Sequence, residues 1–265
     1  MSHLPRRIVC MSTETTEVLY LLGEQDRIVG ISGFTVRPPQ ARREKKKVSA
    51  FSSAKIGEIL ALQPDLVLGF SNIQADIAAE LVRNGIAVHI FNQRSLAQIL
   101  DMIALLGAMT GKVEAAEQLI TGYQQQMDVI GAQAAQCNKR PRIYFEEWDE
   151  PLICGIRWVS ELIELAGGID CFADLAIEPS AKNRIISPEE VVRRQPDIII
   201  ASWCGKKFRP QHMQQRPLWE TIPAIVYDQV FEIKSADILQ PGPAALSDGL
   251  NQLRTIIKRW QDKQS

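Results

Sequence analysis

The chain has 265 residues, of which 46% are hydrophobic, with a formal net charge of −1 and a pI near 6.3. That length and composition suffice for one large core or two modest ones. The nearly balanced charge gives no indication of a nucleic-acid partner, and no apolar stretch in the sequence reaches the about 18 residues that cross a bilayer.

The first half of the chain alternates short apolar strands with helices. We expect strands at 7–11, 27–32, 66–70 and 87–91, and helices at 16–23, 55–62 and 75–84. This alternation is typical of βαβ units with a parallel sheet. The basic run at 42–47 follows Arg37-Pro38-Pro39, and we expect it to be a solvated loop.

The middle of the chain changes to long helical stretches. From Ser95 to about Gln136 apolar residues recur at three- and four-residue spacing, and Gly111 is expected to divide the region into two helices. The second helix, at 112–135, contains no proline and would be about 35 Å long. A helix of that length between two α/β halves is expected to act as a rigid bridge.

The second half returns to strands and helices. We expect strands at 142–145, 198–201, 224–227 and 230–234, a helix at 160–166 and a closing helix at 244–261. Ser187, followed by Pro188 and then by Glu190, has the pattern of a helix start with an N-cap serine and proline in the first turn.

Two segments of the chain repeat each other. Residues 58–68 and 190–200 each read as a short helix, a Gln-Pro-Asp turn and an apolar strand. Such a repeat indicates two similar lobes, which we place at 1–94 and 139–265, with the bridging helical region at 95–138. The expected fold class is α/β, with two Rossmann-like lobes of parallel strands joined by a single long helix. Two such lobes form a cleft where a small ligand can bind.

The chain lacks the sequence motifs of the common catalytic and metal sites. There is no Gly-x-Gly-x-x-Gly after the first strand, no Gly-rich phosphate loop ending in Lys and Ser or Thr, no Cys-x-x-Cys and no His-x-x-x-His. His89 lies inside an expected strand and is more typical of a packed residue than of a ligand. We therefore expect no intrinsic cofactor, no metal site and no enzymatic activity.

The cysteines and the start of the chain bear on its compartment. Five cysteines at scattered spacings favour reduced thiols over a disulfide framework. Arg6-Arg7 is not followed by the apolar segment and small-residue cleavage site of a signal peptide. The sequence as it stands predicts a cytoplasmic protein, with a periplasmic protein lacking its signal peptide as the alternative.

Aromatic residues gather where the expected strands end. Phe34 and Phe70 lie after strands of the first half, and Trp148 and Trp203 after strands of the second. In open α/β sheets ligands bind outside the carboxyl ends of the strands. One interpretation is that these residues cap the sheets as core. The other is a cleft lined with flat apolar faces for a large planar or macrocyclic ligand.

Several short segments carry a resemblance to a known family. They are Val29-Gly30-Ile31-Ser32-Gly33-Phe34, Pro38-Pro39-Gln40-Ala41, Val48-Ser49-Ala50-Phe51, Ala166-Gly167-Gly168 and Ser187-Pro188-Glu189. In these segments and in element order the chain resembles the helical-backbone substrate-binding proteins of cobalamin and iron-siderophore ABC importers, most closely those that bind cobalamin. The resemblance implies the class III substrate-binding fold and a corrinoid, a cobalt-containing macrocycle, as bound ligand.

The resemblance also implies a set of ligand-binding residues. Phe34, Phe51 and Phe70 match aromatic positions that contact one side of the corrin, where family members carry Tyr or Trp. From the second lobe, Trp148 and Trp203 are expected to close the other side, with Glu147 and Arg184 at polar edges of the ligand. The turn after the first strand adds two polar residues, Ser12 and Thr13.

An ABC permease is a further partner that the resemblance implies. Importer-associated members present one glutamate from each lobe to arginines of the permease. Glu189 matches that position in the second lobe, but Gly57 stands at the first-lobe position. We therefore expect a binding protein that no longer serves a permease.

Three hypotheses of function stay open. The first is a non-enzymatic protein that captures a corrinoid or a related macrocyclic or metal-chelate ligand in the cleft. The second is an ordinary substrate-binding component of a cobalamin or iron-siderophore importer. The third is an enzyme that uses Glu146, Glu147 or Asp149 as acid or base, since crowded carboxylates can raise one another's pKa.

Overall fold

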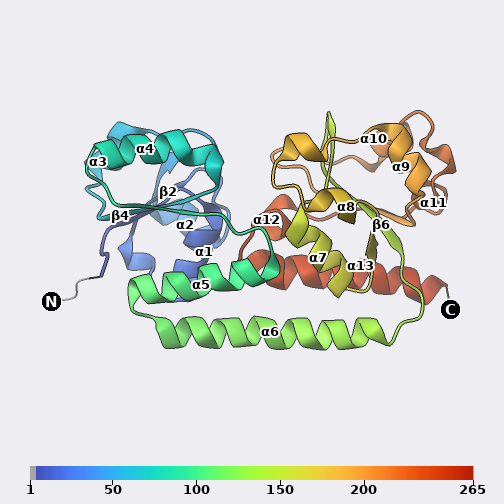
Figure 1. Cartoon of the computed structure of the whole chain (residues 1–265), viewed down its shortest axis with the longest axis horizontal. Helices are drawn as coiled ribbons and strands as arrows, with labels where there is room; N and C mark the ends of the chain where they lie inside the picture. The colour runs from blue at the N-terminus through green and yellow to red at the C-terminus, as the bar shows by residue number, and fades with distance from the viewer. Residues whose placement is uncertain (1–3, 265) are drawn as a thin grey trace. The chain divides into compact units, whose positions relative to one another are not determined.

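A computed structural model describes residues 4–264 and divides the chain into two compact units. Unit 1 comprises the chain up to Gln93 together with Ala97–Gly122, and unit 2 comprises Arg94–Leu96 and the chain from Tyr123 onward. Each unit is built on its own five-stranded sheet (Figure 1). The predicted α/β class with two lobes is confirmed.

The sheet of unit 1 is entirely parallel, in the order β3-β2-β1-β4-β5. Its strands are β1 (Ile8–Cys10), β2 (Ile28–Ser32), β3 (Lys46–Ser49), β4 (Leu66–Phe70) and β5 (Val88–Phe91). Successive strands are added on one side of β1 and then on the other. The sheet therefore has a topological switch point between β1 and β4, where open α/β sheets bind ligands.

Helices cover both faces of this sheet (Figure 1). They are α1 (Thr13–Leu21), α2 (Pro39–Glu44), α3 (Ile56–Ala61), α4 (Ala75–Arg83) and α5 (Leu96–Thr110). Alternate strand residues point to opposite faces, so Val9 and Val67 pack in one cluster with Ile59 of α3 and Leu81 of α4. Burial on both faces explains why the central strands β1 and β4 are continuous apolar runs.

The long helix predicted in the middle of the chain is present as α6 (Val113–Ala135), which has 23 residues that are divided between the two units. It is separated from α5 at Gly111, which has a φ of 74°. Glycine adopts this left-handed conformation without steric cost. The predicted single bridging helix and its break at Gly111 are both confirmed.

The sheet of unit 2 has the order β10-β9-β6-β7, with β8 also paired to β6. Its strands are β6 (Arg142–Asp149), β7 (Leu152–Cys154), β8 (Ile169–Asp170), β9 (Ile198–Ala201) and β10 (Val230–Glu232). All pairs are parallel except β6 with β7, which form an antiparallel hairpin. The hairpin is a difference from the predicted all-parallel lobe.

Helices and turns of unit 2 also lie on both sides of its sheet (Figure 1). The α-helices are α7 (Arg157–Leu165), α8 (Ala173–Ala176), α9 (Pro188–Arg194), α10 (Pro210–Gln214), α11 (Pro223–Val226), α12 (Ser235–Ile238) and α13 (Leu250–Lys263). A π-helical turn, η5 (Ala245–Gly249), precedes α13, and η3 (Ala181–Arg184) is a short 3₁₀ turn of this unit, as η2 (Asn72–Gln74) is of unit 1. The N-cap role predicted for Ser187 is confirmed, because its side chain accepts a hydrogen bond from the Glu190 N–H.

Some predicted elements are wrong, and the physical reasons are local. Residues 224–226 belong to helix α11, with Tyr227 as its C-cap, rather than to a strand, because Pro223 occupies the first helical position and fixes a helical φ. The basic run at 42–47 is not a loop: it ends α2 and begins β3, whose Lys46 and Lys47 are exposed. An edge strand with outward lysines has too little apolar character to be recognised in sequence.

The repeated Gln-Pro-Asp turn forms the same set of hydrogen bonds in each unit, an arrangement of one aspartate and one arginine that we call the clasp. In unit 1 the Asp65 carboxylate accepts the Arg7 backbone N–H, and the Arg7 guanidinium donates to the Leu62 carbonyl at the end of α3. In unit 2 Asp197 accepts the Arg142 N–H, and the Arg142 guanidinium donates to the Arg194 carbonyl at the end of α9. Each clasp joins the first residues of a strand to a helix end, which explains the repeat in physical terms.

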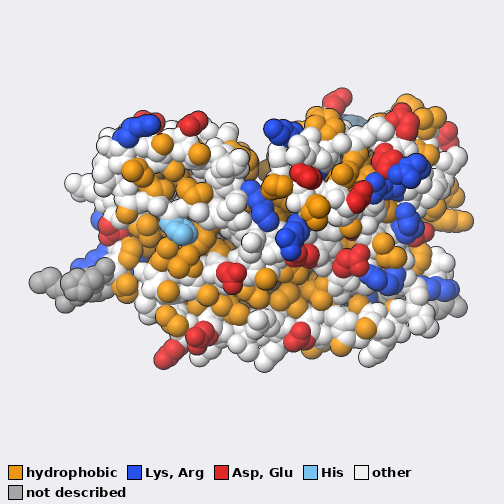
Figure 2. Space-filling view, in the orientation of Figure 1, with side chains coloured by type: hydrophobic (Ala, Val, Ile, Leu, Met, Phe, Trp, Pro, Cys, Tyr) orange, Lys and Arg blue, Asp and Glu red, His pale blue; other side chains and the backbone are white. Residues whose placement is uncertain are grey.

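The surface and the thiols agree with the composition. Acidic and basic side chains are interspersed on the face of unit 2 that Figure 2 presents. All five cysteines are free thiols, as predicted. Burial raises the pKa of Cys10, Cys154 and Cys171 to about 12. Within residues 4–264, no helix has the length and apolar character of a membrane span.

Candidate functional site

The carboxyl edge of the unit 1 sheet brings together most of the residues predicted for the first lobe. Ser12 and Thr13 follow β1, Phe34 follows β2, Phe51 follows β3, and Phe70 ends β4. Parallel strands end at the same edge, so these segments are neighbours. The Gly33 N–H donates to the Ser49 carbonyl at 2.7 Å, which joins the loops that carry Phe34 and Phe51.

A buried glutamine that the sequence did not single out connects three of these segments. The Gln74 amide nitrogen donates to the carbonyls of Met11 (3.3 Å) and Phe51 (3.1 Å), and its oxygen accepts the Phe70 N–H at 3.0 Å. The close approach depends on Gly69, since a Cβ there would lie 2.6 Å from the Gln74 oxygen. A Gly-Phe-Ser run at the end of a strand was the only signal of this arrangement in the sequence.

The aromatic residues of this edge differ in exposure. Phe34 and Phe51 are 47% and 53% exposed, and Ile73 beside Gln74 is 48% exposed. Phe70 is buried, so it is part of the core rather than of the exposed surface. Ser71, between Phe70 and the exposed Ile73, has a φ of 63°, an uncommon conformation for serine, and its hydroxyl accepts the Ile73 N–H. Large apolar side chains grouped at the end of a sheet are typical of a binding surface.

Ser12 and Thr13 belong to a polar, buried start of helix α1. The Ser12 and Thr15 hydroxyls lie 3.0 Å apart, and the Thr13 hydroxyl donates to the Glu14 carboxylate at 3.2 Å. Burial raises the pKa of Glu14, while hydrogen bonds from Ser12, Thr13 and Gln93 oppose the rise. These hydroxyls lie beside the switch point of the sheet, but in this structure they bond mainly within their own turn.

In unit 2, two predicted site residues pair with each other. The Arg184 guanidinium donates to both carboxylate oxygens of Glu147, at 2.5 and 3.3 Å, and to the carbonyl of Cys154. The Arg184 side chain is 2% exposed, whereas that of Glu147 is 23% exposed. Glu147 is therefore the member of the pair that can reach a ligand, and Arg184 orients it.

The two predicted tryptophans of unit 2 have different environments. Trp148 is partly buried, and its indole N–H donates to the Glu150 carbonyl at 3.0 Å. Trp203 is 4% exposed and packs against Phe208 with ring centroids 5.2 Å apart. Burial favours the core interpretation for Trp203. Lys206 lies near both rings, with its Nζ 5.7 Å from the Trp148 centroid and 5.4 Å from that of Trp203.

Each of the three clustered acids of β6 has its own basic partner. Glu146 is fully buried and accepts from both Arg216 guanidinium nitrogens (2.6 and 2.9 Å), from the Tyr144 hydroxyl (2.9 Å) and from the Trp203 indole (3.1 Å). Burial raises the pKa of Glu146, and these donors oppose that rise. Glu147 pairs with Arg184, and Asp149 pairs with Lys206. The arrangement is that of structural ion pairs.

The two positions compared for permease docking are structurally equivalent. Gly57 is the second residue of α3 and Glu189 the second residue of α9, and both are exposed. Hydrogen bonds to its own backbone N–H and to Ser187 lower the pKa of Glu189, so its carboxylate is charged at neutral pH.

The described residues contain no candidate metal centre. Across residues 4–264, no three or more His, Cys, Asp or Glu side chains come together in a group that could hold a metal ion. His89 lies in β5 with its ring 4.4 Å from that of Phe91, and burial lowers its pKa. The site therefore consists of apolar rings and paired polar groups.

Comparisons with known proteins match nearly the whole chain. A model of the periplasmic binding protein family matches residues 8–236. A vitamin B12-binding protein of Vibrio cholerae serotype O1 is 27% identical over 257 residues, which cover 95% of this chain and 89% of that protein.

Solved structures share the fold. The periplasmic vitamin B12 binding protein of Vibrio cholerae matches with a TM-score of 0.77 and 24% identity, over 97% of this chain and 98% of that one. A periplasmic heme-binding protein from Roseiflexus sp. RS-1 matches with a TM-score of 0.82 and 22% identity, over 95% and 99%.

Proposed function

Because the chain belongs to the periplasmic binding protein family, we propose that it is a non-enzymatic binding protein whose ligand is a corrinoid. The observation that carries the proposal is the exposure of Phe34 and Phe51 in adjoining loops at the carboxyl edge of the unit 1 sheet. Flat apolar side chains held by a rigid edge suit the face of a large macrocycle. Glu147 and Trp148 are the contacts proposed from unit 2.

The residue set favours a corrinoid over heme. Heme iron is held in proteins by His, Cys, Met or Tyr, and none of the proposed ligand residues is of these types. The residues predicted from the sequence are Ser12, Thr13, Phe34, Phe51, Phe70, Glu147, Trp148, Arg184 and Trp203, of which Phe34, Phe51, Glu147 and Trp148 are not buried. Cobalamin carries its own axial ligands to cobalt, so it needs shape and apolar contact from the protein rather than coordination. The name of the Vibrio cholerae relative supports the same ligand class.

Calorimetric titration of the purified chain with cyanocobalamin tests the proposal. We expect saturable binding that Phe34→Ala and Phe51→Ala each weaken about tenfold or more, since each removes a large apolar contact. Val82→Ala is the matched control, because Val82 is exposed on α4 away from the edge, and it should leave the affinity unchanged. Absence of saturable binding, or equal effects of all three variants, would refute the proposal.

Delivery to an ABC permease is a second candidate function, and the exposed, charged Glu189 favours it. Gly57 at the equivalent position of unit 1 weakens it, because one carboxylate is missing. In vesicles containing a cobalamin permease and its ATPase, we expect Gly57→Glu to increase ligand-stimulated ATP hydrolysis and Glu189→Gln to decrease it. Identical rates for the wild-type chain and both variants would exclude permease docking at these positions.

A further inference from the structure

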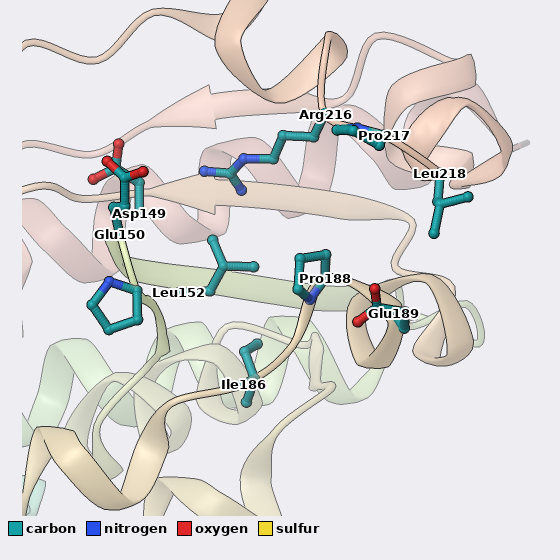
Figure 3. Close-up of a pocket in the computed structure, with 10 residues that line it drawn as sticks. Asp149, Glu150, Leu152, Ile186, Pro188, Glu189, Arg216, Pro217 and Leu218 are labelled. Atoms are coloured by element: carbon teal, nitrogen blue, oxygen red, sulfur yellow. The ribbon is translucent and has the colours of Figure 1, made fainter.

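Unit 2 contains a pocket that the proposed corrinoid contacts do not use. Its volume is about 480 Å³, within the range of small-molecule sites. Three segments form it: the turn from β6 to β7, the start of α9, and the loop at 216–218 (Figure 3). All of its lining residues belong to unit 2.

The middle of the pocket is apolar and rigid. In Figure 3 Leu152 and Pro188 occupy the centre of the view, with Ile186 below them. Leu152 and Ile186 are part of the core of unit 2, so this floor is fixed by packing. Pro151 and Pro217 also line the pocket and restrict the backbone on two sides.

Carboxylates lie at both ends of this apolar middle. Asp149 and Glu150 stand at one end in Figure 3, and Glu189 stands at the other. Lys206 pairs with one oxygen of Asp149, but the other oxygen is buried and has no hydrogen-bond partner within residues 4–264. Glu150 and Glu189 are both exposed, so a ligand in the pocket can reach their carboxylates.

Arg216 does not neutralise these acids. Its guanidinium lines the pocket, but both of its terminal nitrogens are bound to Glu146, at 2.6 and 2.9 Å. The charge of Arg216 is therefore already balanced within the core. Because Lys206 pairs with Asp149, the excess of negative charge in the pocket comes from Glu150 and Glu189.

The wall next to Arg216 is held in an unusual conformation. Leu218 has a φ of 71°, although leucine rarely adopts the left-handed region, and its side chain is 53% exposed. Conformations of this kind persist only where the surroundings impose them, and they cluster at ligand sites. Leu218 is thus presented beside the Glu189 end of the pocket (Figure 3).

We propose that this pocket binds a short α,ω-diamine, a molecule with an ammonium group at each end of an apolar methylene chain. One ammonium pairs with Glu150, the other pairs with Glu189, and the methylenes pack on Leu152 and Pro188. The pocket thus has the same order of features as the ligand, with charge at the ends and apolar surface in the middle. The inference does not depend on the proposed corrinoid site.

Calorimetry of the full chain with three probes that share a five-carbon chain tests the ligand class. We expect 1,5-diaminopentane to bind about threefold or more tightly than pentylamine, because only the diamine reaches both acidic ends. Added salt should weaken the diamine more than the monoamine, and pentane-1,5-diol should give no saturable heat. Equal affinity for the diamine and the monoamine, or no saturable binding of either, would overturn the proposal.

Two variants that each remove one negative charge test whether the second ammonium of the diamine binds at Glu189. Glu189→Gln should remove the advantage of the diamine over pentylamine, whereas Glu117→Gln, an exposed site on α6 in unit 1, should leave it intact. Loss of the advantage in both variants would assign the effect to net charge and overturn the site. Saturable binding of a lysine-rich peptide without binding of the free diamine would assign the pocket to a protein partner instead.

Discussion

At the scale of single residues, the carboxylate of Glu146 organises the interior of unit 2. Four hydrogen bonds from Tyr144, Trp203 and Arg216 converge on it. Arg216 comes from a loop far along the chain, and its guanidinium also lies 4.6 Å from the centre of the Trp219 ring. A buried carboxylate with this full set of donors fixes the loop against β6.

Replacing Arg216 by an uncharged residue should strongly reduce the stability of the protein. Arg216→Met leaves a buried carboxylate without its counter-charge, so we expect a loss of about 3 kcal/mol in the free energy of unfolding, measured with urea. Lys234→Met breaks a surface pair with Glu232 and should cost less than about 1 kcal/mol. Similar losses in the two variants would show that Glu146 does not depend on Arg216.

Glu14 should make stability depend on pH in a definite direction. Burial raises its pKa in the folded state above the ordinary value of 4.5. Above pH 4.5 the unfolded chain loses this proton while the folded chain keeps it, so the contribution of Glu14 to stability falls as pH rises toward the folded-state pKa. Below pH 4.5 both states are protonated and the contribution is constant.

We therefore expect Glu14→Gln to be more stable than the wild-type chain at pH 7, and the difference to shrink toward pH 4. This stability difference is measured from the unfolding midpoints of the wild-type and Glu14→Gln proteins between pH 4 and pH 8. Because other groups titrate alike in both proteins, their effects cancel in the comparison. A difference that stays constant with pH would contradict the account of Glu14.

At the scale of elements, the two clasps should contribute to stability in proportion to the hydrogen bonds that each aspartate accepts. Asp65 accepts the N–H groups of Arg6 and Arg7, whereas Asp197 accepts one backbone N–H within residues 4–264, that of Arg142. We expect Asp65→Ala to cost about 1–2 kcal/mol in the free energy of unfolding, and Asp197→Ala somewhat less. Asp262→Ala, at an exposed position of α13, should cost less than about 0.5 kcal/mol. The same cost at all three sites would mean that the clasps contribute nothing.

Two glycines of unit 1 should respond to alanine with opposite signs. A Cβ at Gly69 would lie 2.6 Å from both Gln74 and Ile90, so Gly69→Ala should destabilise the protein by about 1–3 kcal/mol. Gly57 lies in α3 with open space around it, and Gly57→Ala should stabilise by about 0.5–1 kcal/mol. Thermal unfolding of the two variants measures both. A neutral Gly69→Ala would show that the carboxyl edge is loosely packed.

The elements that were predictable from sequence are those specified by a few neighbouring residues. The strand at Leu66–Phe70, the break at Gly111 and the Ser187 cap follow from apolar runs, glycine and capping chemistry. The hairpin of β6 and β7 was missed because Pro151 and the acids before it read as a loop. The helix at Pro223–Val226 was missed because its apolar residues also suit a strand.

For the site, the sequence predicted which strand ends matter but not how their side chains pair. Phe34 and Phe51 are exposed as a binding surface requires, while Phe70 and Trp203 are packed into cores. Gln74 and Arg216 were missed because their roles depend on contacts between segments distant in sequence. Such contacts have no spacing that sequence periodicity can reveal.

At the scale of the whole molecule, the chain consists of two α/β units with the same local construction and different details. Both repeat the clasp, and both have central parallel strands. Unit 1 exposes Phe34 and Phe51 at its carboxyl edge, and unit 2 carries the acidic pocket. The repeated segment therefore accounts for the shared fold of the two units, and the residues that follow the strands account for their different binding surfaces.

The most direct test of the central claim is competitive equilibrium dialysis of the full chain against equal concentrations of cobalamin and heme, followed by elemental analysis. The proposed aromatic surface without an axial ligand predicts retention of about one cobalt per chain, with little iron. Preferential retention of iron, or retention of neither metal, would contradict the account.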